Sequence, residues 1–295
     1  MRFTTYLAGG LALALAAPAV AQDSTAVPPG VSTDSAGDTA PPEPITVSGS
    51  AAIVSDYRFR GVSQSDKDLA VQAAITVTHE SGLYVGAWGS NLAGWGTFGG
   101  SNVELDLLAG YKLPVGGGTL DVGVTYYMYP GGADETDFFE PYAKLSGTVG
   151  PLSLTAGVAY APAQEALGRV FFTGAAAAAG LPDDPGDKED NLYLWGDFAA
   201  GVPTTPFTLK AHIGYSDGNN GLGPNATSVA PTGKYWDYSI GAEATFKGLT
   251  FNVSYVDTDI SRADGAYLQP SFSRGQDGTG SIADGIIVAS VTAAF

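Results

Sequence analysis

The sequence predicts an all-β chain that forms an antiparallel transmembrane β-barrel of twelve strands, with ten or fourteen strands as the alternatives. Three observations predict this fold. Apolar and polar residues alternate with period two through most of residues 45–295, as in strands that have one apolar face. The links between these segments are alternately short and long. The chain ends in an aromatic residue, Phe295, on the apolar face of its last segment.

The composition excludes several other classes of protein. The 295 residues include no Cys and two His, and 15% are charged, against about 25% in an average domain. The absence of Cys excludes disulfides and thiol nucleophiles, and we expect no cofactor, no metal and no catalytic residue. Acidic residues outnumber basic ones by 30 to 13, which gives a formal net charge of −17. A nucleic-acid partner is therefore not expected, since phosphates need Lys and Arg.

Residues 1–21 have the pattern of a secretory signal peptide. Arg2 precedes an apolar run from Leu7 to Ala17, and the small residues before Ala21 predict cleavage between Ala21 and Gln22. This run is too short for a membrane-spanning helix, which needs about 20 apolar residues. Residues 22–44 contain five Pro and four acidic residues, without Lys, Arg or aromatics. We predict a disordered, acidic, Pro-rich periplasmic leader there, followed by the barrel over residues 45–295.

The strand segments are easiest to see where the alternation is strict. In Thr119–Tyr129, Leu120, Val122 and Val124 alternate with Thr119, Asp121 and Gly123. Twelve such segments are predicted, near 45–59, 69–80, 83–92, 102–112, 119–129, 138–149, 152–161, 190–201, 206–216, 236–247, 249–259 and 285–295. An alternation of short and long links places all the short turns at one rim and all the long loops at the other, as in outer-membrane barrels.

Aromatic residues gather at the two ends of the predicted strands, which predicts two interfacial girdles. Near the long loops lie Tyr126, Phe138, Phe139, Tyr160, Trp195, Tyr215, Trp236 and Tyr255, and near the short turns lie Tyr111, Phe207, Phe246, Phe251 and Phe295. A terminal Phe is similar to the recognition signal of outer-membrane barrel assembly. We therefore expect outer-membrane lipids and the barrel-assembly machinery, acting on the C-terminal strand, as partners.

One stretch near the end of the first segment identifies a family. Residues 55–65, Ser-Asp-Tyr-Arg-Phe-Arg-Gly-Val-Ser-Gln-Ser, resemble the opening signature of the TorF-like porin family. Supporting stretches are residues 88–91, 104–106, 110–111, 126–131, 235–241 and 255–259. The resemblance covers residues 45–295 and implies an outer-membrane barrel of a Gram-negative bacterium, called a porin by its shape, with no established substrate.

The polar face of the strands carries charged residues that we predict to face the lumen. These pore-lining candidates are Glu104, Asp106, Asp121, Glu140, Lys144, Asp197, Lys210, His212, Asp237 and Glu243. An acidic lining predicts a passive channel for small polar solutes or ions that prefers cations. The alternative is a plugged barrel whose interior charges pair with one another, because twelve strands fall between filled eight-stranded barrels and open ones of 16–18 strands.

Asp56, Arg58 and Arg60 lie near the predicted outer end of the first segment. The arginines either pair with Asp56 and interior acids or form an anion clamp at the pore mouth. Acidic residues in the long loops, such as Asp134, Asp183 and Asp187, either form a negative mouth or are ordinary solvated loop residues. Two other functions stay open: a structural or surface-interaction barrel without transport and, more remotely, a lipid-modifying enzyme built on His79 or His212.

Overall fold

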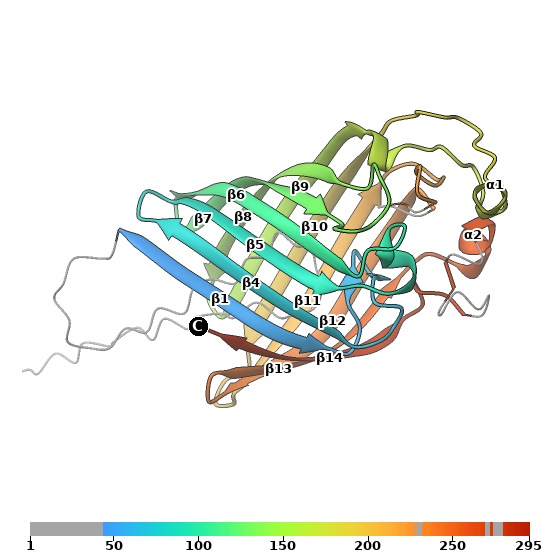
Figure 1. Ribbon diagram of the computed structural model, residues 1–295. Helices are drawn as coiled ribbons and strands as arrows, with labels where there is room; N and C mark the ends of the chain where they lie inside the picture. The colour runs from blue at the N-terminus through green and yellow to red at the C-terminus, as the bar shows by residue number, and fades with distance from the viewer. Residues whose placement is uncertain (1–43, 227, 229–231, 269–271, 274–279) are drawn as a thin grey trace, which may run out of the picture.

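The computed structural model is a closed antiparallel barrel of twelve strands (Figure 1). It describes residues 44–226, 228, 232–268, 272–273 and 280–295, so the predicted signal peptide and nearly all of the predicted leader lie outside the described residues. Among the described residues, no helix is long and apolar enough to span a membrane. The barrel strands are β1 (Ile45–Val54), β4 (Ala70–His79), β5 (Leu83–Asn91), β6 (Val103–Val115), β7 (Gly118–Met128), β8 (Phe138–Val149), β9 (Leu152–Gln164), β10 (Glu189–Gly201), β11 (Phe207–Asp217), β12 (Lys234–Phe246), β13 (Leu249–Thr258) and β14 (Ile286–Ala294).

Neighbouring barrel strands follow one another along the chain, and the barrel closes where β14 pairs with β1. Ala51 lies opposite Ala293 in that register, and Gly49 and Phe295 exchange two backbone hydrogen bonds of 2.8 and 3.0 Å. Because the number of strands is even, the start of β1 and the chain end lie at the same rim, while α1 (Gly174–Ala179) and α2 (Arg262–Gly265) lie at the other (Figure 1). We call these the short-turn rim and the long-loop rim.

The predicted strand count and the alternation of links are confirmed. Short turns connect β4 to β5, β6 to β7, β8 to β9, β10 to β11 and β12 to β13. The turn at Lys247–Gly248 has φ angles of 51° and 79°, and two positive φ values are what a type I′ hairpin requires. The long loops hold the remaining short helices, η1 (Gly94–Thr97), η2 (Glu165–Leu167) and η3 (Ala266–Leu268), together with α1 and α2.

The outer wall of the barrel is apolar. Ile53, Ile240 and Val253 expose 52%, 66% and 54% of their surface, whereas their polar strand neighbours point into the lumen. A continuous apolar band of this kind is far larger than the patches that water-soluble monomers expose. A closed barrel also leaves no unpaired backbone edge, which is the condition for crossing a lipid bilayer. The fold is therefore a transmembrane barrel.

Two residues assigned to the outer aromatic girdle face the lumen instead, so that part of the prediction is wrong. Phe138 and Trp195 are buried. Phe138 stacks on Tyr127 with ring centroids 4.4 Å apart, and Trp195 stacks on Tyr193 at 5.6 Å. Both residues occupy the inward parity of their strands. Phe138 lies at the long-loop end of β8, and Trp195 lies in the middle of β10. The outer wall keeps exposed aromatics at both rims, including Tyr126, Phe139, Tyr160, Trp236 and Tyr255 at one, and Phe207, Phe246, Phe251 and Phe295 at the other.

The loops at the long-loop rim pack into a hydrophobic cluster of their own. Phe171 and Leu222 exchange two backbone hydrogen bonds of 2.9 and 2.8 Å, which ties two long loops together. Trp95 meets Phe272 edge to face at 5.1 Å. The buried members of this cluster are Val62, Trp95, Val170, Phe171, Tyr235, Leu222, Ile260, Leu268, Phe272, Ile282 and Ala283. Packed side chains thus hold the long loops together at this rim.

The first predicted strand segment, 45–59, is too long. Strand β1 ends at Val54, and the chain then turns into the lumen. Residues 55–69, which we call the inner hairpin, contain the two-residue strands β2 (Arg58–Phe59) and β3 (Val62–Ser63). Arg60 and Gly61 form its turn with φ angles of 47° and 78°. This local turn chemistry, together with the polar contacts described below, prevents the segment from continuing the barrel wall.

Candidate functional site

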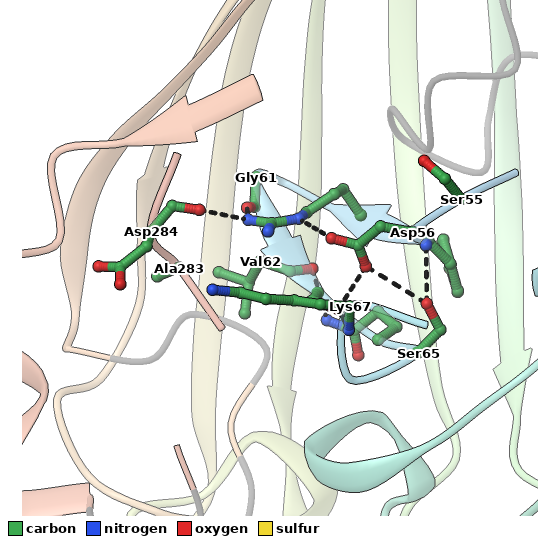
Figure 2. A network of polar contacts seen from close by, with 12 residues as sticks. Ser55, Asp56, Gly61, Val62, Ser65, Lys67, Ala283 and Asp284 are labelled. Carbon is green, nitrogen blue, oxygen red and sulfur yellow. Dashed lines mark hydrogen bonds and ion pairs between the residues drawn. The ribbon is translucent and has the colours of Figure 1, made fainter. Parts of the chain in front are cut away.

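The inner hairpin is held together by the carboxylate of Asp56. Its oxygens accept hydrogen bonds from Arg58 Nε at 2.7 Å, Ser63 Oγ at 2.5 Å and Ser65 Oγ at 3.3 Å. Ser65 Oγ also accepts a hydrogen bond from the backbone N–H of Tyr57 at 2.8 Å. Figure 2 shows Asp56 and Ser65 facing each other at the base of the hairpin. The buried carboxylate of Asp56 therefore holds both arms of the inner hairpin together.

Arg58 links the hairpin to the last long loop. Its Nη1 donates to the carbonyl oxygens of Gly61 at 2.7 Å and Asp284 at 3.2 Å (Figure 2). The guanidinium is fully buried and lies beside the Asp56 carboxylate. A buried cation needs such a partner, because desolvation of an isolated charge is costly. Of the two alternatives for Arg58, the structure contains the pairing with Asp56.

Arg60, at the tip of the hairpin, reaches the opposite wall of the barrel. Its Nη2 lies 2.7 Å from each carboxylate oxygen of Glu140 on β8. Its guanidinium also lies over the rings of Phe59, at 4.7 Å, and Tyr193 on β10, at 4.2 Å. Strands β8 and β10 flank β9, the strand halfway round the closed order from β1. The inner hairpin therefore crosses the full width of the lumen.

Aromatic contacts attach the hairpin to the near wall as well. Tyr57 donates its hydroxyl to Glu104 on β6 at 2.8 Å and packs against Trp88 on β5 at 5.3 Å. Phe59 meets Tyr127 on β7 at 5.9 Å. Burial and the neighbouring Glu104 carboxylate raise the pKa of Tyr57 well above its ordinary value, so the phenol is neutral and acts as a donor. The hairpin thus contacts the inner faces of strands on both sides of the barrel.

Gly61 offers a test of how tightly the hairpin tip is packed. A Cβ atom at Gly61 would lie 2.4 Å from Thr258 Cγ2 and 2.9 Å from Asp237 Cβ, whereas one at Gly131, which has the same φ of 78°, would meet nothing within 4 Å. We expect Gly131→Ala to cost about 1–2 kcal/mol, from the left-handed backbone alone. Gly61→Ala should cost about 1–3 kcal/mol more, because the methyl group overpacks the hairpin against β12 and β13.

The measurement is urea-induced unfolding of both variants in phospholipid vesicles. Equal losses of unfolding free energy in the two variants would mean that the hairpin tip is not packed against the wall.

The structure places most of the predicted pore-lining residues out of contact with water. Seven of the ten are at most 6% exposed: Glu104, Asp106, Asp121, Glu140, His212, Asp237 and Glu243. The remaining three, Lys144, Lys210 and Asp197, keep 15%, 15% and 39% of their side chains exposed. The strands thus direct these groups into the lumen, where Asp121 and Glu243 are buried even in the half near the short turns, and Lys144, Lys210 and Asp197 keep an exposed part.

The three partly exposed residues belong to charge pairs near the short-turn rim. Lys144 Nζ lies 3.6 Å from Asp121 Oδ2, and Lys210 Nζ lies 3.3 Å from Glu243 Oε2. Asp197 Oδ1 lies 2.7 Å from His212 Nδ1. In the first two pairs one lysine faces one carboxylate, so these charges compensate each other.

His212 connects this region to the wall beneath the hairpin tip. Its Nε2 lies 3.0 Å from Asp237 Oδ1 and 3.0 Å from the Tyr193 hydroxyl. The Tyr193 hydroxyl also donates to Asp237. The other histidine, His79, contacts Ser81 Oγ at 2.9 Å on the exposed short-turn rim. Among the described residues, no group of three or more His, Cys, Asp and Glu is placed to hold a metal ion.

Several acidic residues of the long loops have local structural contacts. Asp137, Asp183 and Asp187 accept backbone hydrogen bonds from Tyr129, Phe172 and Arg169 at 3.0, 2.7 and 2.8 Å. Lys188 Nζ lies 2.6 Å from Glu165 Oε1, and this contact lowers the pKa of Glu165 below its ordinary value. These carboxylates therefore organise the loops in addition to adding negative charge.

Sequence reasoning missed Tyr127 and Tyr193, which complete the surroundings of Arg60. Tyr127 donates its hydroxyl to Glu140 Oε2 at 3.2 Å, and Tyr193 lies under the guanidinium. Both residues have the inward parity of their strands, and an aromatic residue on an otherwise polar face is a usable signal. Their role is visible only once the hairpin is known to enter the lumen.

A closed antiparallel barrel with an apolar outer wall and a hairpin across its lumen defines the class as a transmembrane β-barrel. The chain belongs to the Gcw_chp family, described as bacterial protein of unknown function, whose family model matches residues 38–295. This finding supports a family assignment for the barrel, while the TorF-like name is not part of it. No curated protein matches the chain.

Solved structures of outer-membrane proteins are similar to the chain in general shape. OmpF of Salmonella typhi in complex with daunomycin is 9% identical, with a TM-score of 0.41 over 85% of this chain and 97% of that one. An outer-membrane channel from Pseudomonas putida F1 is 10% identical, with a TM-score of 0.40 over 86% and 96%. The translocator domain of the autotransporter NalP from Neisseria meningitidis is 14% identical, with a TM-score of 0.40 over 85% and 87%.

Proposed function

We propose that this protein is a porin of the outer membrane, of the TorF-like type, that conducts small polar solutes or ions and is closed in this conformation by its inner hairpin. The apolar wall, the short turns at one rim and the long loops at the other support this location. Export through a signal peptide cleaved between Ala21 and Gln22, in a Gram-negative bacterium, belongs to the same proposal. The proposal also includes recognition of Phe295 by the barrel-assembly machinery. Phe295 is 74% exposed on the wall.

One observation carries the proposal: nearer the short turns than the buried Arg60–Glu140 pair, the inward side chains of Lys144, Lys210 and Asp197 keep 15%, 15% and 39% of their surface exposed. Tyr84, Asp121 and Glu243 in the same half are buried, so this half is mostly polar and solvated in part. A polar, partly solvated half ending at a separate hairpin fits a pore with a closed constriction.

The charge distribution supports a preference for cations in the conducting state. Arg58 and Arg60 belong to the hairpin, whereas Glu104, Asp106 and Glu140 belong to the barrel strands. The hairpin as a whole carries three basic residues, Arg58, Arg60 and Lys67, and three acidic ones, Asp56, Asp66 and Asp68. If it leaves the lumen, Glu140 stays on the wall without its partner Arg60. The outer half is then lined by carboxylates, which attract cations and repel anions. Small polar solutes are thus the expected transported molecules, with cations preferred.

The test is planar-bilayer current from the refolded mature protein under a salt gradient. We expect infrequent, discrete steps with a cation-selective reversal potential. Neutralising Glu104, Asp106 and Asp121 together, as Gln, Asn and Asn, should move the reversal potential towards zero while steps persist. An unchanged reversal potential would contradict the acidic lining.

The second candidate function is a closed structural or surface-interaction barrel, which the complete burial of the Arg60–Glu140 pair favours. It predicts no current from protein that is shown to be folded, even after the hairpin has been removed. The two functions are therefore separated by the hairpin variant described in the Discussion.

A further inference from the structure

We propose that the inner wall around Glu140 is a binding site for guanidinium-type organic cations, which Arg60 occupies in this conformation. We call Tyr127, Glu140 and Tyr193, on β7, β8 and β10, the wall site. All three side chains come from barrel strands, and all three are buried at 1% exposure or less. The cation comes from a separate segment, so the wall site and its occupant are parts of the chain that can separate.

The wall site has the two features that a flat, delocalised cation requires. The carboxylate of Glu140 places both oxygens 2.7 Å from one guanidinium nitrogen of Arg60. The ring of Tyr193 lies 4.2 Å from the guanidinium carbon. Guanidinium groups bind carboxylates through directed hydrogen bonds and stack on aromatic faces, because they are planar and weakly hydrated. The hairpin thus shows how such a ligand would sit.

Contacts independent of the hairpin hold the wall site in shape. The Tyr193 hydroxyl donates to Asp237 at 3.1 Å and lies 3.0 Å from His212 Nε2, which fixes the ring. Tyr127 stacks on Phe138 and donates to Glu140 at 3.2 Å, which orients the carboxylate. Removal of the Arg60 side chain therefore leaves a preorganised carboxylate and ring, and preorganisation lowers the cost of binding.

Other classes of ligand fit less well. Glu140 repels anions, and Asp237, which accepts a hydrogen bond from Tyr193, adds a second carboxylate beside the site. A calcium ion takes six to eight oxygen ligands, and the described residues contain no group of acids and histidines placed to hold a metal ion. A neutral solute would leave the buried carboxylate without a counter-charge. The chemistry selects an organic cation with a planar head.

The transport part of this inference, that such cations are solutes of the channel, rests on the proposed function. The binding part does not depend on conduction. Binding is therefore measured on purified protein in detergent micelles, without any current.

The experiment uses Arg60→Ala in the full mature chain, with N-ethylguanidinium as the probe and N-ethylurea as its neutral isostere. We expect N-ethylguanidinium at saturation to raise the thermal unfolding midpoint of this variant by about 2–4 °C. N-Ethylurea should leave the midpoint unchanged. The matched control, Arg60→Ala with Glu140→Gln, keeps the vacated space but lacks the carboxylate, and should respond to neither compound.

Equal shifts in the two variants, or with the two probes, would overturn the proposal. If Arg60→Ala alone does not fold, the yield of folded barrel is measured during refolding with each probe. Recovery with N-ethylguanidinium and not with N-ethylurea supports the wall site, and no recovery, while the double variant folds, overturns it. A barrel that conducts without binding the probe disproves this inference alone, and one that binds without conducting disproves only the channel function.

Discussion

Arg60→Ala is expected to destabilise the folded barrel by about 3–5 kcal/mol, the loss typical of removing one partner from a buried ion pair. The substitution leaves the Glu140 carboxylate fully buried with the Tyr127 hydroxyl as its remaining described donor. It also removes the cation from the face of Tyr193. The measurement is equilibrium unfolding in phospholipid vesicles, followed by tryptophan fluorescence, with urea as denaturant because guanidinium is itself the proposed ligand.

Arg262→Ala is the matched control for this prediction. Arg262 also forms an ion pair, 2.9 Å from Asp284, but its side chain is 72% exposed. Exposed pairs contribute about 0.2–1 kcal/mol, so this variant should lose little stability. Combining Arg60→Ala with Glu140→Gln should recover part of the loss, since the buried charge is then removed from both sides. Similar losses for Arg60→Ala and Arg262→Ala would mean that the hairpin tip is solvated in the membrane-bound protein.

Excision of the hairpin tip should convert the rare current steps of the native protein into a steady open conductance, several-fold larger per channel. The excised residues are Arg58–Ser63, replaced by Gly-Gly. The ends can be joined without strain, because the Gln64 N–H donates to the Tyr57 carbonyl at 2.7 Å. Removing both arginines opens the constriction and uncovers Glu140, while Tyr57 stays in place on Glu104. The reversal potential should therefore become more cation-selective, as measured in planar bilayers under a salt gradient.

Replacing helix α1 in the same way is the control for a general effect of shortening a loop. Gly174–Ala179 is also six residues long and lies at the long-loop rim outside the lumen (Figure 1). This change should leave conductance near the native value. A folded hairpin variant without current would rule out the channel and establish the closed structural barrel instead.

Much of the barrel could be predicted from the sequence, because the alternation of apolar and polar residues is visible within each strand. Asp121 and Val122 are consecutive residues, so their side chains point to opposite faces of the strand. In a wall between lipid and lumen, this alternation places Asp121 in the lumen and Val122 in the lipid. The same rule identified the charged inward residues. It failed at Phe138 and Trp195, because an aromatic residue near a strand end is compatible with both an interfacial girdle and a filled lumen.

The inner hairpin could not be predicted in the same way. Residues 55–59 continue the alternation of β1 closely enough to be counted with it, and the turn at Arg60–Gly61 is a two-residue signal within a polar stretch. Its partners are remote: Glu140 is 80 residues from Arg60, and Asp284 is 226 residues from Arg58. The candidate site therefore depends on three-dimensional contacts that local periodicity does not contain, although Arg58 and Arg60 themselves were recognised as candidates.

The same remoteness imposes an order of events on barrel assembly. The hairpin belongs to the first strand connection, but Asp284 lies just before β14, and β14 completes the wall by pairing with β1. We expect the hairpin to enter before this last pairing of strands forms, because the lumen is then still open at its side and entry is fastest. Contacts this distant in sequence form slowly. The wall is therefore expected to close around a hairpin that is already in place. Variants of the hairpin should slow insertion into the membrane, in addition to any effect on the current.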